Sequence, residues 1–223
     1  MKFTGFSRED FLCFPYGSRE RKLEVKEKLY RFIELVSQRL KDHNPKLHKQ
    51  LAYKGVGNLE KDAKGCWGYL SKAKVQSNSA HFNFGVDDEG LFGGVHLERP
   101  GPIRRLLSNI KDDMSGFLET LNSLEPNIVI TIHERIPVLG DNSQPLPRRF
   151  NWERLCELQS KRFDRFALDY LLDELETLEY SAISFRWQYY WTYRLDLLNS
   201  DVIVDDVAET IVLLQPIYAF TIR

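Results

Sequence analysis

The sequence predicts an α+β protein built on a single, mainly antiparallel sheet, with helices packed mostly on one face of that sheet. The strongest observation is a hairpin in which strands at residues 80–86 and 91–98 flank a four-residue turn that ends in Gly90. Amphipathic helical stretches separate this hairpin from other strand-like stretches. The composition also fits a folded core, since 43 % of the 223 residues are hydrophobic and the net charge is −1.

The same composition excludes several classes of protein. A disordered chain would be less hydrophobic and would carry a larger net charge. A membrane-spanning helix needs about 18 or more consecutive apolar residues, and the sequence contains no such run. A protein that binds nucleic acid through bulk positive charge would not balance 31 basic with 32 acidic side chains. Residues 1–223 are therefore expected to form a single globular α+β domain without membrane contact.

Cysteine usage and the first residues bear on location. Cys13, Cys66 and Cys156 lie far apart and form no CxxC motif, so neither a zinc site nor a disulfide framework is indicated. Met1 is followed by charged sequence rather than by the apolar core of a signal peptide. Both observations favour a cytoplasmic protein. No cofactor is expected.

In chain order, the first predicted element is a short helix that begins after Ser7, a residue type that caps helix N-termini. A long amphipathic helix follows from Ser18 to Asn44, where Pro45 ends it. Its apolar positions recur at helical spacing: Val25, Leu29, Phe32, Ile33, Val36 and Leu40. Residues 46–65 are polar and are expected to be irregular, and alternation over residues 67–75 predicts a strand before the hairpin.

After the hairpin, a second amphipathic helix is predicted from Ile103 to Leu121. Isoleucines alternate through residues 127–135, which predicts a buried strand. Residues 137–149 form the only proline-rich stretch and are expected to be an exposed loop. A helix, continuous or broken, is expected from Trp152 to about Leu178, with Asn151 as its cap.

The last predicted strand, residues 183–194, has two faces of different composition. One face is apolar and aromatic: Ile183, Phe185, Trp187, Tyr189, Trp191 and Tyr193. The other is polar: Ser184, Arg186, Gln188, Tyr190, Thr192 and Arg194. A final helix is expected from Asp201, interrupted at Pro216.

Several short segments, in this order along nearly the whole chain, carry a family resemblance: residues 6–11 (FSREDF), 67–72 (WGYLSK), 81–86 (HFNFGV), 121–126 (LNSLEP) and 213–218 (LLQPIY). They resemble the YktB-like family of uncharacterised bacterial proteins, a domain of unknown function. The resemblance implies a cytoplasmic bacterial α+β protein and implies no catalytic residues. The chain departs from the family at 137–149 and 186–194, and residues 90–103 also resemble a second uncharacterised α+β family.

The hairpin register follows if Val86 lies opposite Leu91. His81 then lies opposite His96 on one face, because side chains alternate along a strand. The other face is the natural core face and holds Phe82, Phe84 and Val86.

Directly opposed Cβ atoms lie about 4.5–5.5 Å apart, so His81 and His96 could share a metal or act as an acid–base pair. Glu98 or His133 would be the third ligand. The sequence lacks HxH, HExxH and a cysteine partner, so the favoured interpretation is two histidines satisfied by neighbours and water, without a metal. The adjacent Gly93-Gly94 pair leaves room for a ligand or for another backbone.

A second candidate site consists of Arg186, Gln188, Tyr190 and Arg194 on the last strand. Two arginines that flank an aromatic ring suit a phosphate, a carboxylate or a stacked base. Arg186 and Arg194 would stand roughly 27 Å apart at about 3.3–3.4 Å per residue, which suits an extended nucleic-acid strand or acidic peptide. The alternative is a solvated face whose arginines pair with acids of a covering helix, such as Asp169.

Two function hypotheses follow. The preferred one is a non-enzymatic binding or regulatory module that holds an anionic ligand or nucleic acid through Arg186, Gln188, Tyr190 and Arg194. The alternative is a small hydrolase or phosphodiesterase-like enzyme that uses His81 and His96, although no full set of nucleophile, base and orienting residue is recognisable. Convergence of the histidines in one cleft would favour the enzyme.

Overall fold

The computed structural model describes residues 3–59, 63–75, 78–124, 128–139, 145–159, 163–177 and 181–222. In this part of the chain, seven strands form one sheet with the order β1-β2-β3-β4-β7-β5-β6, and all neighbouring strands are antiparallel. The strands are β1 (Tyr53–Val56), β2 (Gly65–Ser71), β3 (His81–Asp87), β4 (Gly90–Leu97), β5 (Val129–Leu139), β6 (Pro145–Gln159) and β7 (Ser181–Tyr190). The predicted α+β class is confirmed.

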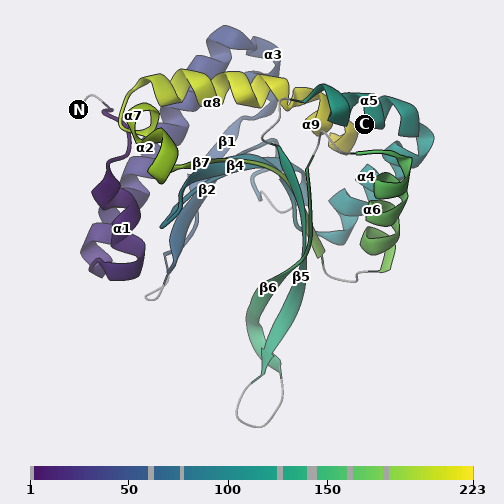
Figure 1. Cartoon of the computed structure of the whole chain (residues 1–223), viewed down its shortest axis with the longest axis horizontal. Coiled ribbons are helices and arrows are strands. Elements are labelled where there is room, and N and C mark those ends of the chain that lie inside the picture. The colour runs from purple at the N-terminus through teal and green to yellow at the C-terminus, as the bar shows by residue number, and fades with distance from the viewer. Residues whose placement is uncertain are drawn as a thin grey trace.

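Helices cover one side of this sheet. They are α1 (Arg8–Tyr16), α2 (Arg19–His43), α3 (Pro45–Gln50), α4 (Pro100–Asp112), α5 (Met114–Ser123), α6 (Arg165–Thr177), α7 (Trp191–Leu198), α8 (Val202–Leu213) and α9 (Gln215–Ile222). The sheet is arched, and the helices lie on its convex side and along both flanks (Figure 1). None of these described helices is long and apolar enough to cross a membrane.

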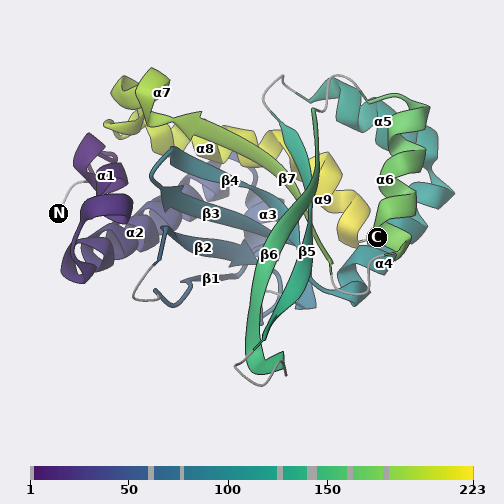
Figure 2. The same ribbon diagram turned by 60° about the horizontal axis from the view of Figure 1, so that its bottom comes forward.

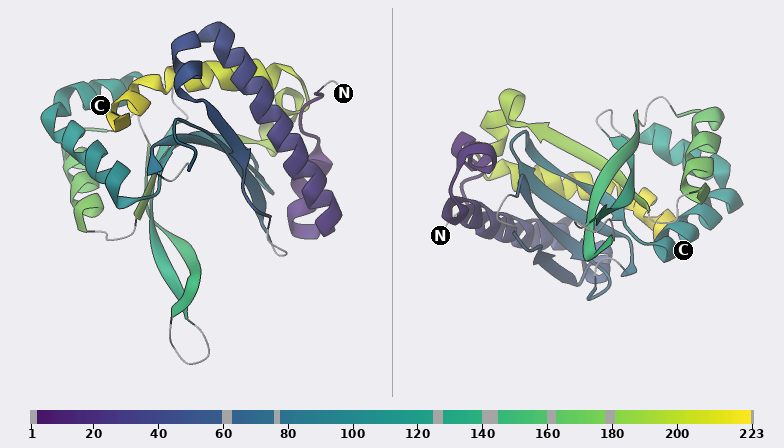
Figure 3. Two further views of the ribbon diagram at one scale, coloured as in Figure 1. Left: turned by 180° about the vertical axis from the view of Figure 1, so that it is seen from behind. Right: turned by 90° about the horizontal axis from the view of Figure 1, so that it is seen from below.

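The concave side of the arch is the open face of the sheet. In Figure 2 this face turns toward the viewer, and no described helix crosses it. The view from below in Figure 3 gives the same arrangement, with the helices behind the sheet. The β5–β6 hairpin extends beyond the other strands at the lower end of the arch (Figure 1). The expectation of helices mostly on one face is therefore correct.

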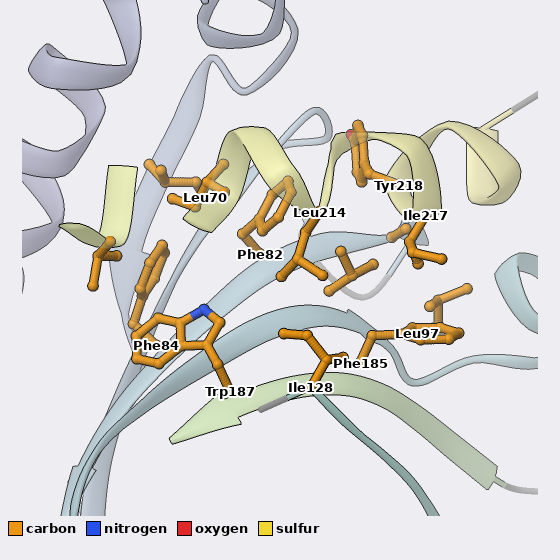
Figure 4. Packing of buried hydrophobic residues seen from close by; sticks show 14 of the residues in the cluster. Leu70, Phe82, Phe84, Leu97, Ile128, Phe185, Trp187, Leu214, Ile217 and Tyr218 are labelled. Atoms are coloured by element: carbon orange, nitrogen blue, oxygen red, sulfur yellow. The ribbon is translucent and has the colours of Figure 1, made fainter. Parts of the chain in front are cut away.

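The core lies between the convex face and the helices. Side chains of β3 and β7 point at α8 and α9, where Phe82 packs against Tyr218 with ring centroids 5.3 Å apart (Figure 4). Phe84 meets Phe32 of α2 edge to face at 6.4 Å. The β3–β4 register is the predicted one, with His81 opposite His96 and Val86 opposite Leu91. Phe82, Phe84 and Val86 are fully buried, as predicted.

Several elements differ from the sequence predictions because tertiary pairing or a local cap intervenes. The helix predicted from Ile103 to Leu121 is two helices, since the Asp113 side chain accepts from the backbone N–H of Gly116 and starts α5. The loop predicted over 46–65 contains α3 and β1. Short polar elements such as these carry little periodic signal.

The largest error concerns the segment from 137 onward. The predicted helix from Trp152 is wrong in its first part, because residues 145–159 form β6 and pair with β5. The proline-rich loop predicted at 137–149 is also wrong in part, since 137–139 and 145–149 belong to these strands and 140–144 lie outside the described residues. A register shift between Pro137 and Leu139 accommodates the proline. Cross-strand hydrogen bonds outweigh the weak helical spacing of the leucines here.

Candidate functional site

Residues that pair across the sheet form rows on the open face. The histidine row consists of Ser71, His81, His96, Ser184, Thr131 and Glu157. The arginine row consists of Tyr69, Asn83, Gly94, Arg186, Val129 and Gln159. The tryptophan row consists of Trp67, Gly85, Phe92 and Gln188. Both candidate sites from the sequence therefore share one face.

Within the histidine row, the two histidines contact each other. Their ring centroids lie 5.2 Å apart in an edge-to-face arrangement. His81 is only 2 % exposed, and its Nδ1 lies 3.2 Å from the carbonyl oxygen of Ser79. His96 Nδ1 lies 2.7 Å from Oγ of Ser184, and its Nε2 lies 3.9 Å from Glu98. His81 is thus packed inside the protein rather than presented to a ligand.

The protonation of His96 follows from these surroundings. Burial lowers the pKa of His96 well below 6.5, and the nearby His81 and His133 lower it further. The imidazole is therefore neutral at pH 7, with a proton on one ring nitrogen only.

A groove of about 520 Å³ lies on this face between β7 and the β3–β4 turn on one side and β5 and β6 on the other. Three of the four predicted ligand-binding residues line it: Arg186, Gln188 and Tyr190. Thr131, His133 and Arg154 complete the wall from the neighbouring strands. The β5–β7 and β5–β6 pairings bring these residues together.

Arg186 is held in a defined position within the groove. Its guanidinium carbon lies 4.0 Å from the centroid of the Phe92 ring, within cation–π range. Its Nη2 donates to Oε1 of Gln188 at 2.7 Å and lies 4.0 Å from Asp87. Burial lowers the pKa of Arg186 and raises the pKa of the Asp87 carboxyl. The guanidinium remains charged, since arginine does not lose its proton in proteins.

Two polar atoms in the groove wall are buried and unpaired. Among the described residues, Nε of Arg186 and Oγ1 of Thr131 have no hydrogen-bond partner. Thr131 is only 4 % exposed. Each buried, unpaired polar group costs about 1–3 kcal/mol, and such atoms are rare in folded proteins. Both residues line the groove.

The other charged groups of the groove are mostly paired. Arg154 forms an ion pair with Glu157, and Gln188 donates to Oε2 of Glu89 at 3.1 Å. Burial lowers the pKa of His133, and the positive charges of Arg154 and Arg186 lower it further. The groove is therefore not a general basic patch, and its unsatisfied donor belongs to Arg186.

Arg194 lies outside this site, so its predicted role in the strand is wrong. The β4–β7 ladder ends at the pair Gly90–Tyr190. Beyond it, Trp191 donates its backbone N–H to Glu89 and its indole N–H to Asp88, and the chain turns into α7. Arg194 is on this helix, with its guanidinium carbon 5.5 Å from the Tyr189 ring centroid. The 27 Å spacing of two strand arginines is wrong for the same reason.

The Gly93-Gly94 pair accommodates protein and not a ligand. A Cβ at Gly93 would lie 2.6 Å from the Trp187 ring, and one at Gly94 would lie 1.9 Å from the carbonyl oxygen of Phe185. No cluster of three or more His, Cys, Asp or Glu side chains suited to a metal ion occurs within the described ranges.

Sequence reasoning missed Ser184 as a partner of His96, Thr131 as a groove residue, and Phe92 as the support for Arg186. Ser184 and His96 are 88 residues apart, and their contact depends on the β4–β7 pairing. Only Phe92, opposite Gly85 in the predicted hairpin, had a signal in the sequence.

Comparison with known proteins gives no assignment for this face. No model of a known protein family matches the chain, and no curated protein matches it significantly. The resemblance to the YktB-like family stays a prediction.

Proposed function

We propose that the groove on the open face binds a ligand through an acidic group, a phosphate or a carboxylate, which Arg186 receives. The observation that carries the proposal is the pair of buried, unpaired atoms in the groove wall, Nε of Arg186 and Oγ1 of Thr131. Nε–H is a donor, and a hydroxyl donates or accepts. An anionic oxygen is the partner that an arginine N–H binds most strongly.

The chemistry of the neighbours supports a single acidic group inside the groove. Phe92 and Gln188 hold the guanidinium in place, so little side-chain freedom remains to be lost on binding. Glu89 and Glu157 line the same groove and would repel a second negative charge beside the one that Arg186 receives. The cytoplasmic location and the bacterial YktB-like relationship remain part of the same proposal.

The side-chain Nε–Hε resonances of the arginines offer a direct test. With ¹⁵N-labelled protein titrated with inorganic phosphate, we expect the Arg186 resonance to shift and saturate. Thr131→Val, which keeps the shape and removes the hydroxyl, should weaken the binding by about fivefold or more. Arg194→Lys is the matched control and should leave the titration unchanged. An Arg186 resonance that does not respond to phosphate would contradict the proposal.

A second function is favoured by one specific contact. Ser184 Oγ lies 2.7 Å from His96 Nδ1, and Glu98 lies 3.9 Å from the other ring nitrogen. A serine, a neutral histidine and a carboxylate in this order could support hydrolysis of an ester. Against this function, Ser184 is buried, with only 6 % exposed, and β7 pairs with β4 and β5 on either side of it, so the sheet uses the backbone N–H groups around Ser184.

A fluorophosphonate probe followed by mass spectrometry of the intact protein tests the hydrolase. Labelling of the wild type that disappears in Ser184→Ala would support it. Ser115→Ala, on α5, is the control. A protein that stays unlabelled would leave only the binding function.

A further inference from the structure

Aromatic rings on the open face lie over glycines of the neighbouring strand segments. A Cβ at Gly57 would come within 2.2 Å of the Trp67 indole, and a Cβ at Gly85 within 2.1 Å of the Phe92 ring. In the same way, a Cβ at Gly55 would lie 2.8 Å from the hydroxyl of Tyr69. The rings therefore rest on backbone that carries no side chain.

This arrangement leaves part of each ring available to solvent. Trp67 is 40 % exposed, although tryptophan is among the residues that gain most from burial. Tyr69 is half-buried beside it, with ring centroids 6.4 Å apart. We refer to Trp67, Tyr69 and Phe92 together as the aromatic platform.

The platform is continuous with the groove. Trp67, Gly85, Phe92 and Gln188 form the tryptophan row, which crosses four adjacent strands. Three spacings of about 4.8 Å make this row about 14 Å long. Phe92 fills the space above Gly85, and the Arg186 guanidinium lies against Phe92. Tyr190, itself 45 % exposed, also lines the groove.

We propose that the open face binds single-stranded nucleic acid, with bases stacked on Trp67 and Tyr69 and a phosphate held by Arg186. This inference rests on the proposed acid-binding function of the groove and names its ligand class. Bases stack on aromatic side chains whatever their sequence.

The combination of groups favours nucleic acid over other extended ligands. An acidic peptide would use Arg186 but would leave the rings of the platform without a partner. A neutral oligosaccharide could cover the rings but would leave the guanidinium uncompensated. Since Arg186 is the main phosphate contact, the logarithm of the affinity should fall with the logarithm of salt concentration with a shallow slope of about −0.7 to −1.5.

The test uses fluorescence anisotropy of a labelled thymidine oligonucleotide of about twelve residues, compared with an abasic strand of equal length and charge. We expect binding at micromolar protein, and about fivefold or more weaker binding of the abasic strand. Trp67→Ala should weaken binding of the thymidine strand by a similar factor and leave the abasic strand unaffected. Tyr193→Ala, which changes an 82 % exposed ring on α7, is the matched control.

The abasic strand needs no change in the protein, so the comparison holds even if Trp67→Ala does not fold. Equal affinity for the two strands, or no binding at tens of micromolar protein, overturns the inference. If the Arg186 resonance still responds to phosphate in that case, the acid-binding function stands and only the nucleic-acid ligand is wrong. Tighter binding of a poly-glutamate peptide or a neutral oligosaccharide would also overturn it.

Discussion

The two faces of the sheet use the same strands for opposite purposes. Along β3 and β7, the side chains that point to the convex face are apolar and fully enclosed, as with Phe82 and Phe185 (Figure 4). Their immediate neighbours point to the concave face and are polar or half-buried, as with Asn83, Arg186 and Gln188. The convex face therefore supplies the stability, and this leaves the concave face free to carry groups that the fold does not satisfy.

The two faces of the sheet do not differ in polarity alone. The buried carboxylate of Asp10, on the helical side, is fully neutralised by Arg21 and Lys28, each at 2.6 Å. On the open face, Arg186 and Thr131 each keep a buried atom without a partner in the described chain. Unpaired buried atoms also occur on the convex side, at Nε1 of Trp187 and at the hydroxyl of Tyr218. What distinguishes the pair on the open face is that both atoms belong to residues that line the groove.

The largest expected effect is on the convex face. Phe84→Ala should lower the free energy of unfolding by about 3–5 kcal/mol, because it removes a fully buried ring that contacts Phe32. Gln188→Ala, on the open face, should cost about 1 kcal/mol or less. Urea unfolding followed by circular dichroism measures both. Similar losses for the two variants would mean that the faces do not divide stability and binding.

The sequence predicts the convex face well for a physical reason. Alternation within the β3–β4 hairpin and the periodicity of α2 are local patterns, and burial of apolar side chains makes them readable. The register of His81 with His96, the burial of Phe82 and the start of α2 at Ser18 were all predictable in this way.

The open face was predictable only in part. Arg186, Gln188 and Tyr190 alternate along one strand, so their shared face could be derived from the chain itself. Arg194 could not be excluded, because the end of β7 is set by the length of β4, a distant partner. The groove itself depends on β5 and β6, and β6 carried a misleading helical spacing.

A second prediction compares the charged groups of the two sides. Asp10→Asn should lower the free energy of unfolding by about 1.5–3 kcal/mol, because both cations lose their shared acceptor charge. The lower part of this range is expected, since Arg21 is partly exposed to solvent. Arg186→Met should cost less, because removing a donor that lacks part of its hydrogen bonds also removes an unsatisfied atom. A larger loss of stability in Arg186→Met than in Asp10→Asn, in thermal or urea unfolding, would contradict this difference between the two faces.

A third prediction concerns the support beneath Phe92. Gly85→Ala should cost about 1–2 kcal/mol, because the new methyl group would lie 2.1 Å from the ring and displace it. Displacement of Phe92 would also loosen Arg186, so the Arg186 Nε–Hε resonance should shift without added ligand. Gly101→Ala is the control, since nothing lies within 4 Å of a Cβ there. Equal stability of the two variants would show that Phe92 moves freely and does not position Arg186.

The smallest expected effect is the pH dependence that the open face contributes. Burial lowers the pKa of His96, whose surroundings are His81 from β3, Ser184 from β7, Glu98 just after β4 and His133 from β5. Below about pH 6.5 the unfolded chain takes up a proton at this residue that the folded protein resists. The unfolded state then binds more protons, so stability falls as the pH falls. Between about pH 7 and pH 5.5, this one group should contribute a loss of about 1 kcal/mol, within the limit of about 1.4 kcal/mol per pH unit.

Urea unfolding across this range measures the effect. The free energy of unfolding should depend less steeply on pH in His96→Gln than in the wild type. His43→Gln, which changes an exposed histidine at the end of α2, should keep the wild-type slope. A slope that survives in His96→Gln would assign the proton to another group and would leave the histidine row without a role in the pH response.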